Sequence, residues 1–281
     1  MPFAKLFSSK RIIVNVDGLE WRRAKWDGWI KQFLIFSEQM AMRFADEIIT
    51  DNAGLQTYVQ EEYGIDSNLI EYGADHVASV YLQPEDLHHY PFLQQPYAFK
   101  VCRIEPENNI HLVLEAFTKM PQLPLVIVGN WSHSNYGRQL LKQYQAVSHL
   151  HLLAPIYEPS KLNKLRSNCQ VYIHGHSAGG TNPSLVEAMY LGLPIIAFDV
   201  IYNRVTTEFK GVYFQSVDDL TARVLQSNPH TLSELGRTMQ WIAERRYTWS
   251  YIASKYAQAI RSESLQPVPA LPFNIPPITS N

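Results

Sequence analysis

The chain has 281 residues, which predicts two domains at roughly 100–200 residues per domain. Its 46% hydrophobic and 18% charged residues are typical of a globular protein and exclude a disordered or fibrous chain. With 24 Lys and Arg against 26 Asp and Glu, the net charge of −2 excludes a globally basic nucleic-acid coat and leaves room for local anion sites. We therefore expect no nucleic-acid partner.

Nothing in the sequence indicates export or a membrane span. No run approaches ~18 apolar residues, and the start, MPFAKLFSSKRIIV, lacks the hydrophobic core of a signal peptide. Cys102 and Cys169 lie in apolar stretches, where we expect buried thiols of a reducing compartment. The prediction is a cytoplasmic protein, free or peripheral at the inner face of the membrane.

Short apolar runs alternate with helical patterns along most of the chain. The first three apolar runs predict strands at residues 11–17, 46–51 and 68–73, because each run is followed by Gly, Asn or Asp, which favour turns. Six later strands are predicted at 98–104, 124–130, 149–155, 169–175, 194–200 and 211–215. The later runs are apolar on both parities, as in a parallel sheet covered by helices on both faces. The alternation predicts a doubly wound α/β fold.

Helical spacing and proline content divide the chain further. A helix is predicted between the first two strands from the spacing of Ile30, Phe33, Leu34, Met40, Ala41 and Phe44. The stretch 74–97 has three prolines and no clear period, so a domain boundary is expected there. The predicted organisation is a partial N-terminal domain (1–80), a linker (81–97), a Rossmann-like domain (98–230), C-terminal helices (231–262) and a Pro-rich tail (263–281).

The richest candidate site follows the strand at 169–175, because ligands of open α/β sheets bind at the carboxyl ends of strands. Residues 174–189 read HGHSAGGTNPSLVEAM. Asn182 suits the N-cap of a helix and Pro183 its first position. The two glycines let backbone amides approach an anion at the helix N-terminus. Glu187, one turn into the helix, can accept hydrogen bonds from sugar hydroxyls, although a capping box from Ser184 to Glu187 would explain the same residues structurally.

The segment GGTNPSLVEAMYLGLPIIAFD (179–199) resembles the nucleotide-sugar loop and helix of GT-B glycosyltransferases, especially glycosyltransferase family 4. Together with residues 15–26, 103–110 and 129–137, it is similar to bacterial rhamnosyltransferase-type enzymes of surface polysaccharide synthesis. The resemblance covers most of residues 11–215. It implies that Glu187 holds the donor ribose. Gly179 stands where family 4 usually has a glutamate that contacts the transferred sugar, and the rhamnosyltransferase-type enzymes share this glycine.

The resemblance also implies a donor site in the second domain. Arg103 would stabilise the donor diphosphate and, with Glu187, carry catalysis, whereas Asn108 replaces the second cation of the family. A salt bridge from Arg103 to Glu105 or Glu107 is the structural alternative. Further donor-binding residues are expected at Gly129, Asn130, Trp131, His176, Ser177, Gly179, Gly180, Thr181, Asn182, Pro183 and Ser184.

The acceptor side is predicted near the N-terminus, at Asp17, Glu20, Arg22 and Arg23. These residues border a run in which Arg22, Arg23, Lys25 and Lys31 alternate with Trp21, Trp26 and Trp29. Such a run can face an anionic acceptor or a lipid head group. Alternatively, it is the solvated face of a helix whose tryptophans pack inward.

The implied function is a retaining glycosyltransferase that needs no metal or other cofactor. It would transfer a sugar, with rhamnose from dTDP-rhamnose as the candidate, to a polysaccharide or lipid-linked acceptor. Two other classes fit parts of the sequence. Gly175-x-Ser177-x-Gly179, followed by Asp199 and His230, matches a hydrolase nucleophile elbow, and His174-x-His176 could contribute to a metal site.

Family members have a complete N-terminal acceptor domain, of which roughly the first hundred residues have no counterpart here. A non-catalytic donor-binding remnant, or one half of a split enzyme, is therefore the main alternative to an active transferase. Three strands make a thin sheet whose edge and helices leave apolar surface exposed. We expect the isolated chain to transfer little or no sugar and to self-associate, or to need a partner that completes the N-terminal domain.

Overall fold

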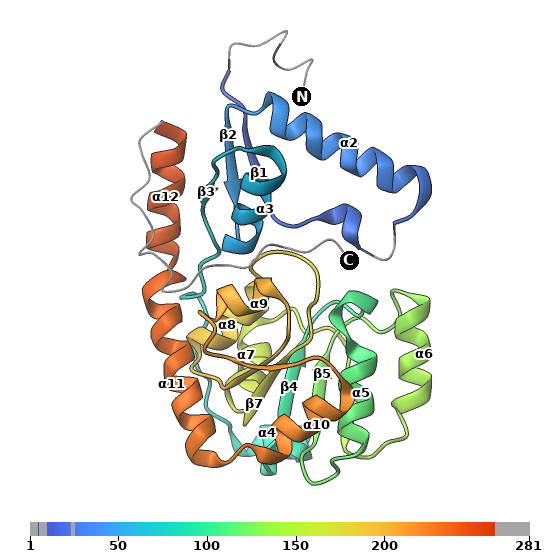
Figure 1. Cartoon of the computed structure of the whole chain (residues 1–281). Helices are drawn as coiled ribbons and strands as arrows, with labels where there is room; N and C mark the ends of the chain where they lie inside the picture. The colour runs from blue at the N-terminus through green and yellow to red at the C-terminus, as the bar shows by residue number, and fades with distance from the viewer. Residues whose placement is uncertain (1–4, 6–9, 24–25, 262–281) are drawn as a thin grey trace.

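The computed structural model describes residue 5, residues 10–23 and residues 26–261. These form two units that lie one above the other in Figure 1, a smaller N-terminal unit and a larger C-terminal unit. Two helices, α11 (Pro229–Arg246) and α12 (Trp249–Arg261), run along one side of both units. The predicted tail at 263–281 lies outside the described residues.

The N-terminal unit contains a three-stranded parallel sheet. Its strands are β1 (Ile13–Val16), β2 (Glu47–Thr50) and β3 (Asn68–Leu69), in that spatial order. They confirm the three predicted strands. The connecting elements are η1 (Glu20–Arg22), α2 (Gly28–Phe44) and α3 (Ala53–Tyr63). Asn52 begins α3 by accepting a hydrogen bond from the Gly54 N–H (2.9 Å), so polar residues follow β2 directly.

The C-terminal unit is a six-stranded parallel sheet, and all six of its predicted strands are confirmed. They are β4 (Ala98–Val101), β5 (Leu125–Val128), β6 (Leu150–Leu153), β7 (Val171–His174), β8 (Ile195–Phe198) and β9 (Val212–Phe214). The spatial order β6-β5-β4-β7-β8-β9 is that of a dinucleotide-binding Rossmann fold. Its strand order reverses between β4 and β7, and ligands of such sheets bind beyond the carboxyl ends of the strands at that point.

Helices cover both faces of this sheet, as the apolar runs predict. They are η3 (Pro106–Asn108), α5 (Ile110–Thr118), α6 (Asn135–Tyr144), α7 (Pro159–Ser167), α8 (Pro183–Tyr190), α9 (Ile201–Thr206) and α10 (Val217–Gln226). Two buried clusters lie on opposite faces, one built around Phe99 and Met189 and the other around Phe117 and Ile127. The sheet is therefore a rigid base for the loops at its carboxyl edge.

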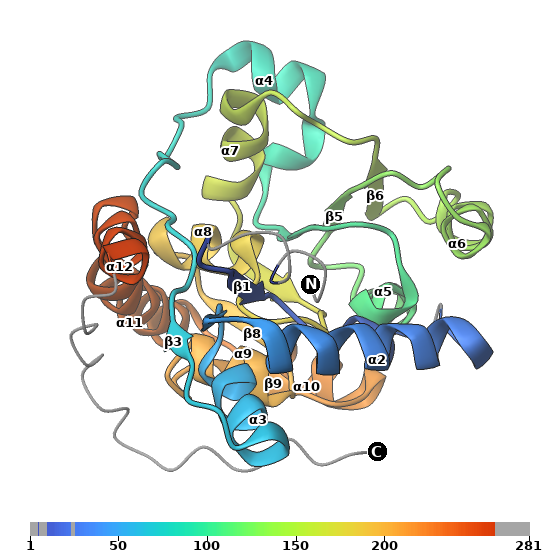
Figure 2. The same ribbon diagram turned by 90° about the horizontal axis from the view of Figure 1, so that it is seen from above.

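Two further segments join the units. The predicted linker contains α4 (Pro84–His89) and η2 (Pro91–Gln94), and Phe92 and Leu93 pack into the C-terminal core. At the other end of the chain, α12 lies beside β3 (Figure 2), and its Ile252 packs with Ile70 of the N-terminal unit. Lys255 of α12 donates a hydrogen bond to the Leu69 carbonyl at 3.0 Å. The C-terminal helix thus completes the core of the first unit.

Helix α2 is present as predicted, but it is not a buried crossover helix. Among its residues only Met42 is buried, whereas Trp29, Phe33 and Phe36 are 77%, 59% and 55% exposed. Figure 1 shows α2 extending beyond the three-stranded sheet, which explains why its apolar face lacks packing partners there. No helix in the described ranges is long and apolar enough to cross a membrane.

Candidate functional site

A cleft of about 140 Å³ lies where the two units meet. The N-terminal unit contributes Asp17, Arg23, Asp51 and Tyr72, which follow its strands. The C-terminal unit contributes Arg103, Glu107, Asn108, His176, Ala178, Gly179, Gly180, Thr181, Asn182, Pro183, Tyr202 and Asn203. The residues from the C-terminal unit come mostly from the loops after β4 and β7. The cleft therefore lies at the point that the strand order indicates.

The wall formed by the loop after β7 ends at the N-terminus of α8. Asn182 is the N-cap, its side chain accepting from the Ser184 N–H at 3.0 Å, and Pro183 takes the first helical position, as predicted. The Ser184 hydroxyl donates to the same Asn182 oxygen, so a capping box that begins at Ser184 is wrong. The positive end of the α8 dipole faces the cleft, where it favours a negatively charged ligand.

Gly179 and Gly180 allow the N-terminal unit to approach this wall closely. Gly179 has a φ of 116°, which L side chains rarely adopt. A Cβ at Gly18, in the loop after β1, would lie 3.1 Å from the Gly179 Cα. A Cβ at Gly180 would overlap the carboxylate of Asp51. A side chain at 180 would therefore push the two units apart, whereas one at 179 would meet open space but strain the backbone.

Two arginines bring positive charge to the cleft. Arg103 follows β4 and is exposed, and no described carboxylate lies within ion-pair distance of it, which contradicts the predicted alternative of a bridge to Glu105 or Glu107. Arg23 pairs instead with Glu107 (3.7 Å) and with Glu20 (2.7 Å). Arg103 is thus the cation in this wall that a diphosphate could engage without breaking an existing ion pair.

Asn108 lines the cleft, but its side-chain amide has a structural partner. It is 3% exposed and donates a hydrogen bond to the Arg103 carbonyl at 2.6 Å. The amide therefore fixes the backbone of the turn that presents Arg103. Asn108 could contact a ligand only through groups other than this N–H, which the Arg103 carbonyl already binds.

Asp51 follows β2 and is the most perturbed carboxyl of the cleft. It is 2% exposed, and its Oδ1 has no hydrogen-bond partner among the described residues. Burial, followed by the nearby charge of Asp17, raises its pKa to about 8, and a hydrogen bond from the Thr181 backbone lowers it. Asp51 is not among the predicted site residues, although it ends a predicted strand, where ligands of parallel sheets bind.

Three basic side chains lie at the C-terminal wall of the cleft: His176, which lines the cleft, and the buried His174 and Lys100. The rings of His174 and His176 stack with centroids 4.3 Å apart. Lys100 in β4 is completely buried, and its Nζ has no hydrogen-bond partner among the described residues. Burial lowers the pKa of Lys100. Burial is also the largest cause that lowers the pKa of both histidines well below the usual range, and the nearby Lys100 lowers it further. The two imidazoles are therefore neutral at pH 7.

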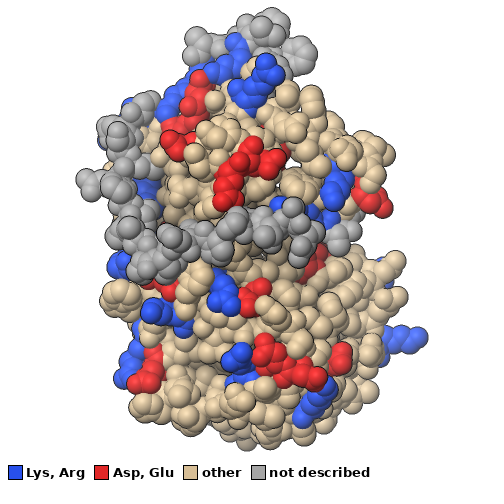
Figure 3. Space-filling view, in the orientation of Figure 1, with Lys and Arg blue, Asp and Glu red and all other residues tan. Residues whose placement is uncertain are grey.

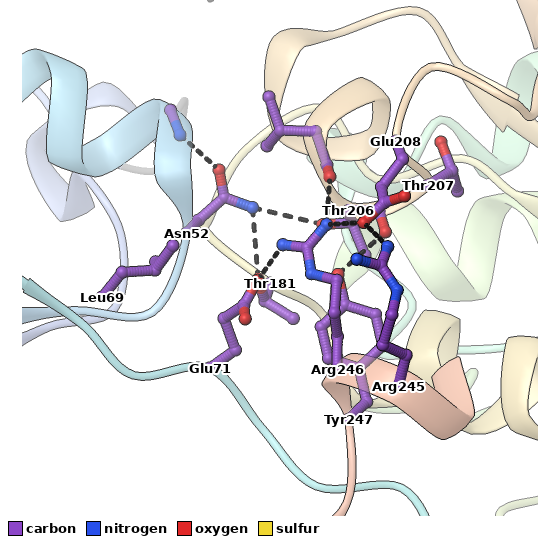
Figure 4. Close-up of polar contacts among 12 residues, drawn as sticks. Asn52, Leu69, Glu71, Thr181, Thr206, Thr207, Glu208, Arg245, Arg246 and Tyr247 are labelled. Atoms are coloured by element: carbon purple, nitrogen blue, oxygen red, sulfur yellow. Dashed lines mark hydrogen bonds and ion pairs between the residues drawn. The ribbon is translucent and has the colours of Figure 1, made fainter. Parts of the chain in front are cut away.

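A buried polar network fixes the two units against each other (Figure 4). Asn52 donates to the hydroxyls of Thr181 and Thr206, each at 3.2 Å. Arg246 of α11 is 3% exposed and pairs with Glu71, after β3, and with Glu208, after α9, at 2.9 Å. These contacts hold the ends of β2 and β3 over the glycine loop. Sequence patterns gave no signal for them, since the partners are up to 175 residues apart.

Glu187 lies one turn into α8, as predicted, and does not line the cleft itself. Its carboxylate is fixed by Arg166 of α7 and by His76 Nε2 at 3.1 Å. Trp249 in turn donates to His76 Nδ1 at 3.1 Å. A ligand that enters from the cleft toward α8 would meet an oriented carboxylate at this position. Its role toward a ribose remains a prediction.

Other predicted donor residues lie away from the cleft. Gly129 packs against the turn after β4, and Asn130 is exposed beyond β5. The Trp131 side chain is 5% exposed and donates to the Leu153 carbonyl at 2.9 Å, so the indole points into the core, and donor binding at Trp131 stays a prediction. Its apolar ring packs into the core because that carbonyl satisfies the indole N–H.

The hydrolase alternative is also wrong. The Ser177 hydroxyl donates to the Glu107 carbonyl (2.9 Å), Asp199 pairs with Arg204, and His230 lies on the surface beside Glu234. These side chains do not form a nucleophile, base and acid in contact. The metal alternative also finds no support, because the described part of the chain contains no cluster of three or more His, Cys, Asp or Glu residues that could hold an ion.

Of the four predicted acceptor-side residues, Asp17 and Arg23 line the cleft. Glu20 pairs with Arg23 and accepts from the Trp26 indole, and Arg22 stacks over the Trp21 ring at 5.0 Å. The basic aromatic run is therefore partly folded on itself, although Trp29 is exposed; Lys25 lies outside the described residues. On the face seen in Figure 3, blue and red side chains are interspersed without a continuous basic patch.

Comparison with family models assigns the two units separately. Residues 84–221 match the model described as Glycosyl transferases group 1, and residues 4–75 match a domain of unknown function, DUF1972. A segment of 97 residues is 29% identical to the GtfA subunit of the UDP-N-acetylglucosamine–peptide N-acetylglucosaminyltransferase of Streptococcus pneumoniae. That segment is 34% of this chain and spans only 18% of the relative.

Solved structures resemble the chain over most of its length. Sucrose-phosphate synthase from Thermosynechococcus elongatus matches with a TM-score of 0.79 at 17% identity, over 92% of this chain and 69% of that one. Anabaena HepE, in complex with UDP-glucose, matches with a TM-score of 0.77 at 16% identity, over 92% and 74%. The α/β fold with parallel sheets is thus the GT-B glycosyltransferase fold that the sequence predicts.

Proposed function

We propose that this chain, whose residues 84–221 form a glycosyl transferases group 1 domain, is a glycosyltransferase that binds a nucleotide-diphosphate sugar in the cleft between its two units. One observation carries the proposal: the N-terminus of α8 and Arg103, which has no ion-pair partner among the described residues, converge on one cleft, at the point where the strand order reverses. This arrangement suits a diphosphate, because backbone amides and a guanidinium both stabilise phosphate oxygens.

Residues in and beside the cleft would bind the remaining parts of such a donor. Glu187, which lies outside the cleft lining and is fixed by Arg166 and His76, would accept hydrogen bonds from ribose hydroxyls. The acceptor would enter from the N-terminal unit, beside Asp17 and Arg23. Catalysis would come from orientation of the two substrates and from electrostatic stabilisation of the departing diphosphate, whose phosphate can take the proton of the acceptor hydroxyl.

The finer features of the reaction rest on the sequence resemblance. They are retention of anomeric configuration, rhamnose from dTDP-rhamnose as the transferred sugar, and a polysaccharide or lipid-linked acceptor. The solved relatives include complexes with UDP and UDP-glucose, which supports a nucleotide-sugar ligand of this general class. A peripheral position at the membrane and a partner that completes the N-terminal unit belong to the same proposal.

Titration calorimetry with UDP, GDP and dTDP, each with and without a sugar, tests the binding part. We expect one nucleotide to bind, and Glu187→Ala to weaken it by about 1–3 kcal/mol, because ribose hydroxyls lose their partner. Glu115→Ala, an exposed change on α5, is the matched control and should bind as wild type does. Undetectable binding of all three nucleotides at millimolar concentration would contradict the proposal.

Release of nucleoside diphosphate from the donor that binds separates an enzyme from a donor-binding remnant. Release by the wild type that falls to background in Glu187→Ala supports the transferase. Binding without any release, in the presence of glycan acceptors, favours the remnant. The two measurements together distinguish a missing donor site from a missing chemical step.

A further inference from the structure

The Asp51 carboxyl lines the cleft and has one oxygen without a hydrogen-bond partner among the described residues. This oxygen is Oδ1, and it is buried, because Asp51 is only 2% exposed. Buried polar atoms are nearly always paired, and a persistent exception at a cleft indicates a ligand position. Arg23 and Arg103, the arginines of the cleft, do not form ion pairs with it.

The surroundings of Asp51 show which part of a ligand it would meet. The carboxyl lies against the Cα of Gly180, so it sits directly over the glycine loop that precedes α8. The diphosphate end of the site, at Arg103 and the α8 N-terminus, is on the C-terminal wall. Asp51 comes from the opposite wall, together with Asp17, whose nearby charge acts on it. A carboxyl can hydrogen-bond to hydroxyl groups in either protonation state, as an acceptor or through its own O–H as a donor.

The position of Asp51 is also tightly fixed. The next residue, Asn52, caps α3 through its Oδ1 and donates to Thr181 through its Nδ2. The backbone of Thr181 contributes a hydrogen bond to Asp51. A rigid carboxyl with one unused oxygen can select hydroxyl geometry, because its rotamer entropy is already lost before the ligand binds.

We propose that Asp51 binds hydroxyl groups of the transferred sugar, so that the N-terminal unit contributes directly to the choice of sugar. The inference rests on the proposed function, because it requires a nucleotide sugar in the cleft. It assigns to Asp51 a binding role across the interface, opposite the loop at 179–182. The sugar would then be held between the two units and the nucleotide by the C-terminal unit alone.

The test compares each nucleotide with its sugar conjugate by titration calorimetry, using UDP and UDP-glucose, UDP and UDP-N-acetylglucosamine, and dTDP and dTDP-rhamnose. For the pair that the wild type binds, Asp51→Asn should bind the nucleoside diphosphate within about twofold of wild type and the nucleotide sugar about tenfold more weakly. Asp51→Leu removes every hydrogen bond of the side chain, so it should weaken binding of the nucleotide sugar more than Asp51→Asn does.

Asp46→Asn is the matched control, because Asp46 precedes β2 at the opposite end of the same strand and is exposed. It should leave both affinities unchanged. An equal loss for nucleotide and nucleotide sugar in both Asp51 variants would overturn the inference and indicate a structural role in the loop, as would no loss for either ligand. If the wild type binds no nucleotide, the proposed function fails first, and this outcome is distinct from a failure at Asp51.

Discussion

Replacement of Arg246 by Met should destabilise the protein strongly, because Arg246 neutralises two buried carboxylates between the units. Its guanidinium pairs with Glu71 and with Glu208, and Arg246 and Glu71 are 3% and 2% exposed. After the change, Glu208 keeps Arg245 as a partner, whereas Glu71 keeps no ion-pair partner among the described residues. An uncompensated buried charge costs about 3–5 kcal/mol, which is a large share of the stability of a typical domain.

Urea denaturation followed by tryptophan fluorescence measures this cost. Glu71→Gln combined with Arg246→Met should recover most of the lost free energy of unfolding, because neither charge is then left alone. Arg237→Met, an exposed change on the same helix, should lie within about 0.5 kcal/mol of wild type. A loss below about 1 kcal/mol in Arg246→Met, or a double variant no more stable than the single one, would refute the reasoning.

Two further predictions concern buried ionisable groups. The pKa of Asp51 is raised from 3.8 to about 8, so between these pH values the folded protein keeps a proton that the unfolded chain releases. The stability that this proton provides is greatest below pH 3.8 and is lost as the pH rises to about 8. The free energy of unfolding of wild type, minus that of Asp51→Asn, should fall by about 1.4 kcal/mol per pH unit between roughly pH 4 and 8. Paired urea titrations measure it, and a difference in unfolding free energy that does not change with pH would contradict the prediction. Lys100→Met should raise the free energy of unfolding by about 1–3 kcal/mol, since Lys100 is completely buried with an unpaired Nζ; a lower midpoint in urea would show that Nζ has a partner.

The sequence predicted the sheets well because their signals are local. All nine strands in the part of the chain that the structure describes were found, since each is a short apolar run bounded by turn residues. The wall after β7 was found because Asn182, Pro183 and the glycines are helix-start and loop signals. The expectation that helices of the three-stranded sheet leave apolar surface exposed is confirmed at α2, although periodicity alone does not say which helix lacks a packing partner.

On the opposite wall of the cleft, Asp17 and Arg23 were predicted, whereas Asp51 and Tyr72 were missed for a different reason. Asp51 contributes only because β2 ends against the glycine loop, and that contact joins residues about 130 positions apart, as the hydrogen bond from Asn52 to Thr181 shows. The pair of Glu71 and Arg246 is equally non-local. The direction of the Trp131 indole, toward the Leu153 carbonyl, was also beyond the sequence, because a strand-end motif predicts only the backbone turn. Such contacts depend on the packing of the two units.

Hydrogen exchange, measured by mass spectrometry with and without the nucleoside diphosphate that binds most tightly among UDP, GDP and dTDP, tests the central claim most directly. If the cleft is the donor site, the nucleotide should slow exchange in peptides that cover residues 103–109 and 175–187, where Arg103 and the N-terminus of α8 lie. Arg103→Met should abolish this protection at the same nucleotide concentration. Protection confined to other parts of the chain, such as the exposed side of α11 around Trp241, or no protection at saturating nucleotide, would contradict the account.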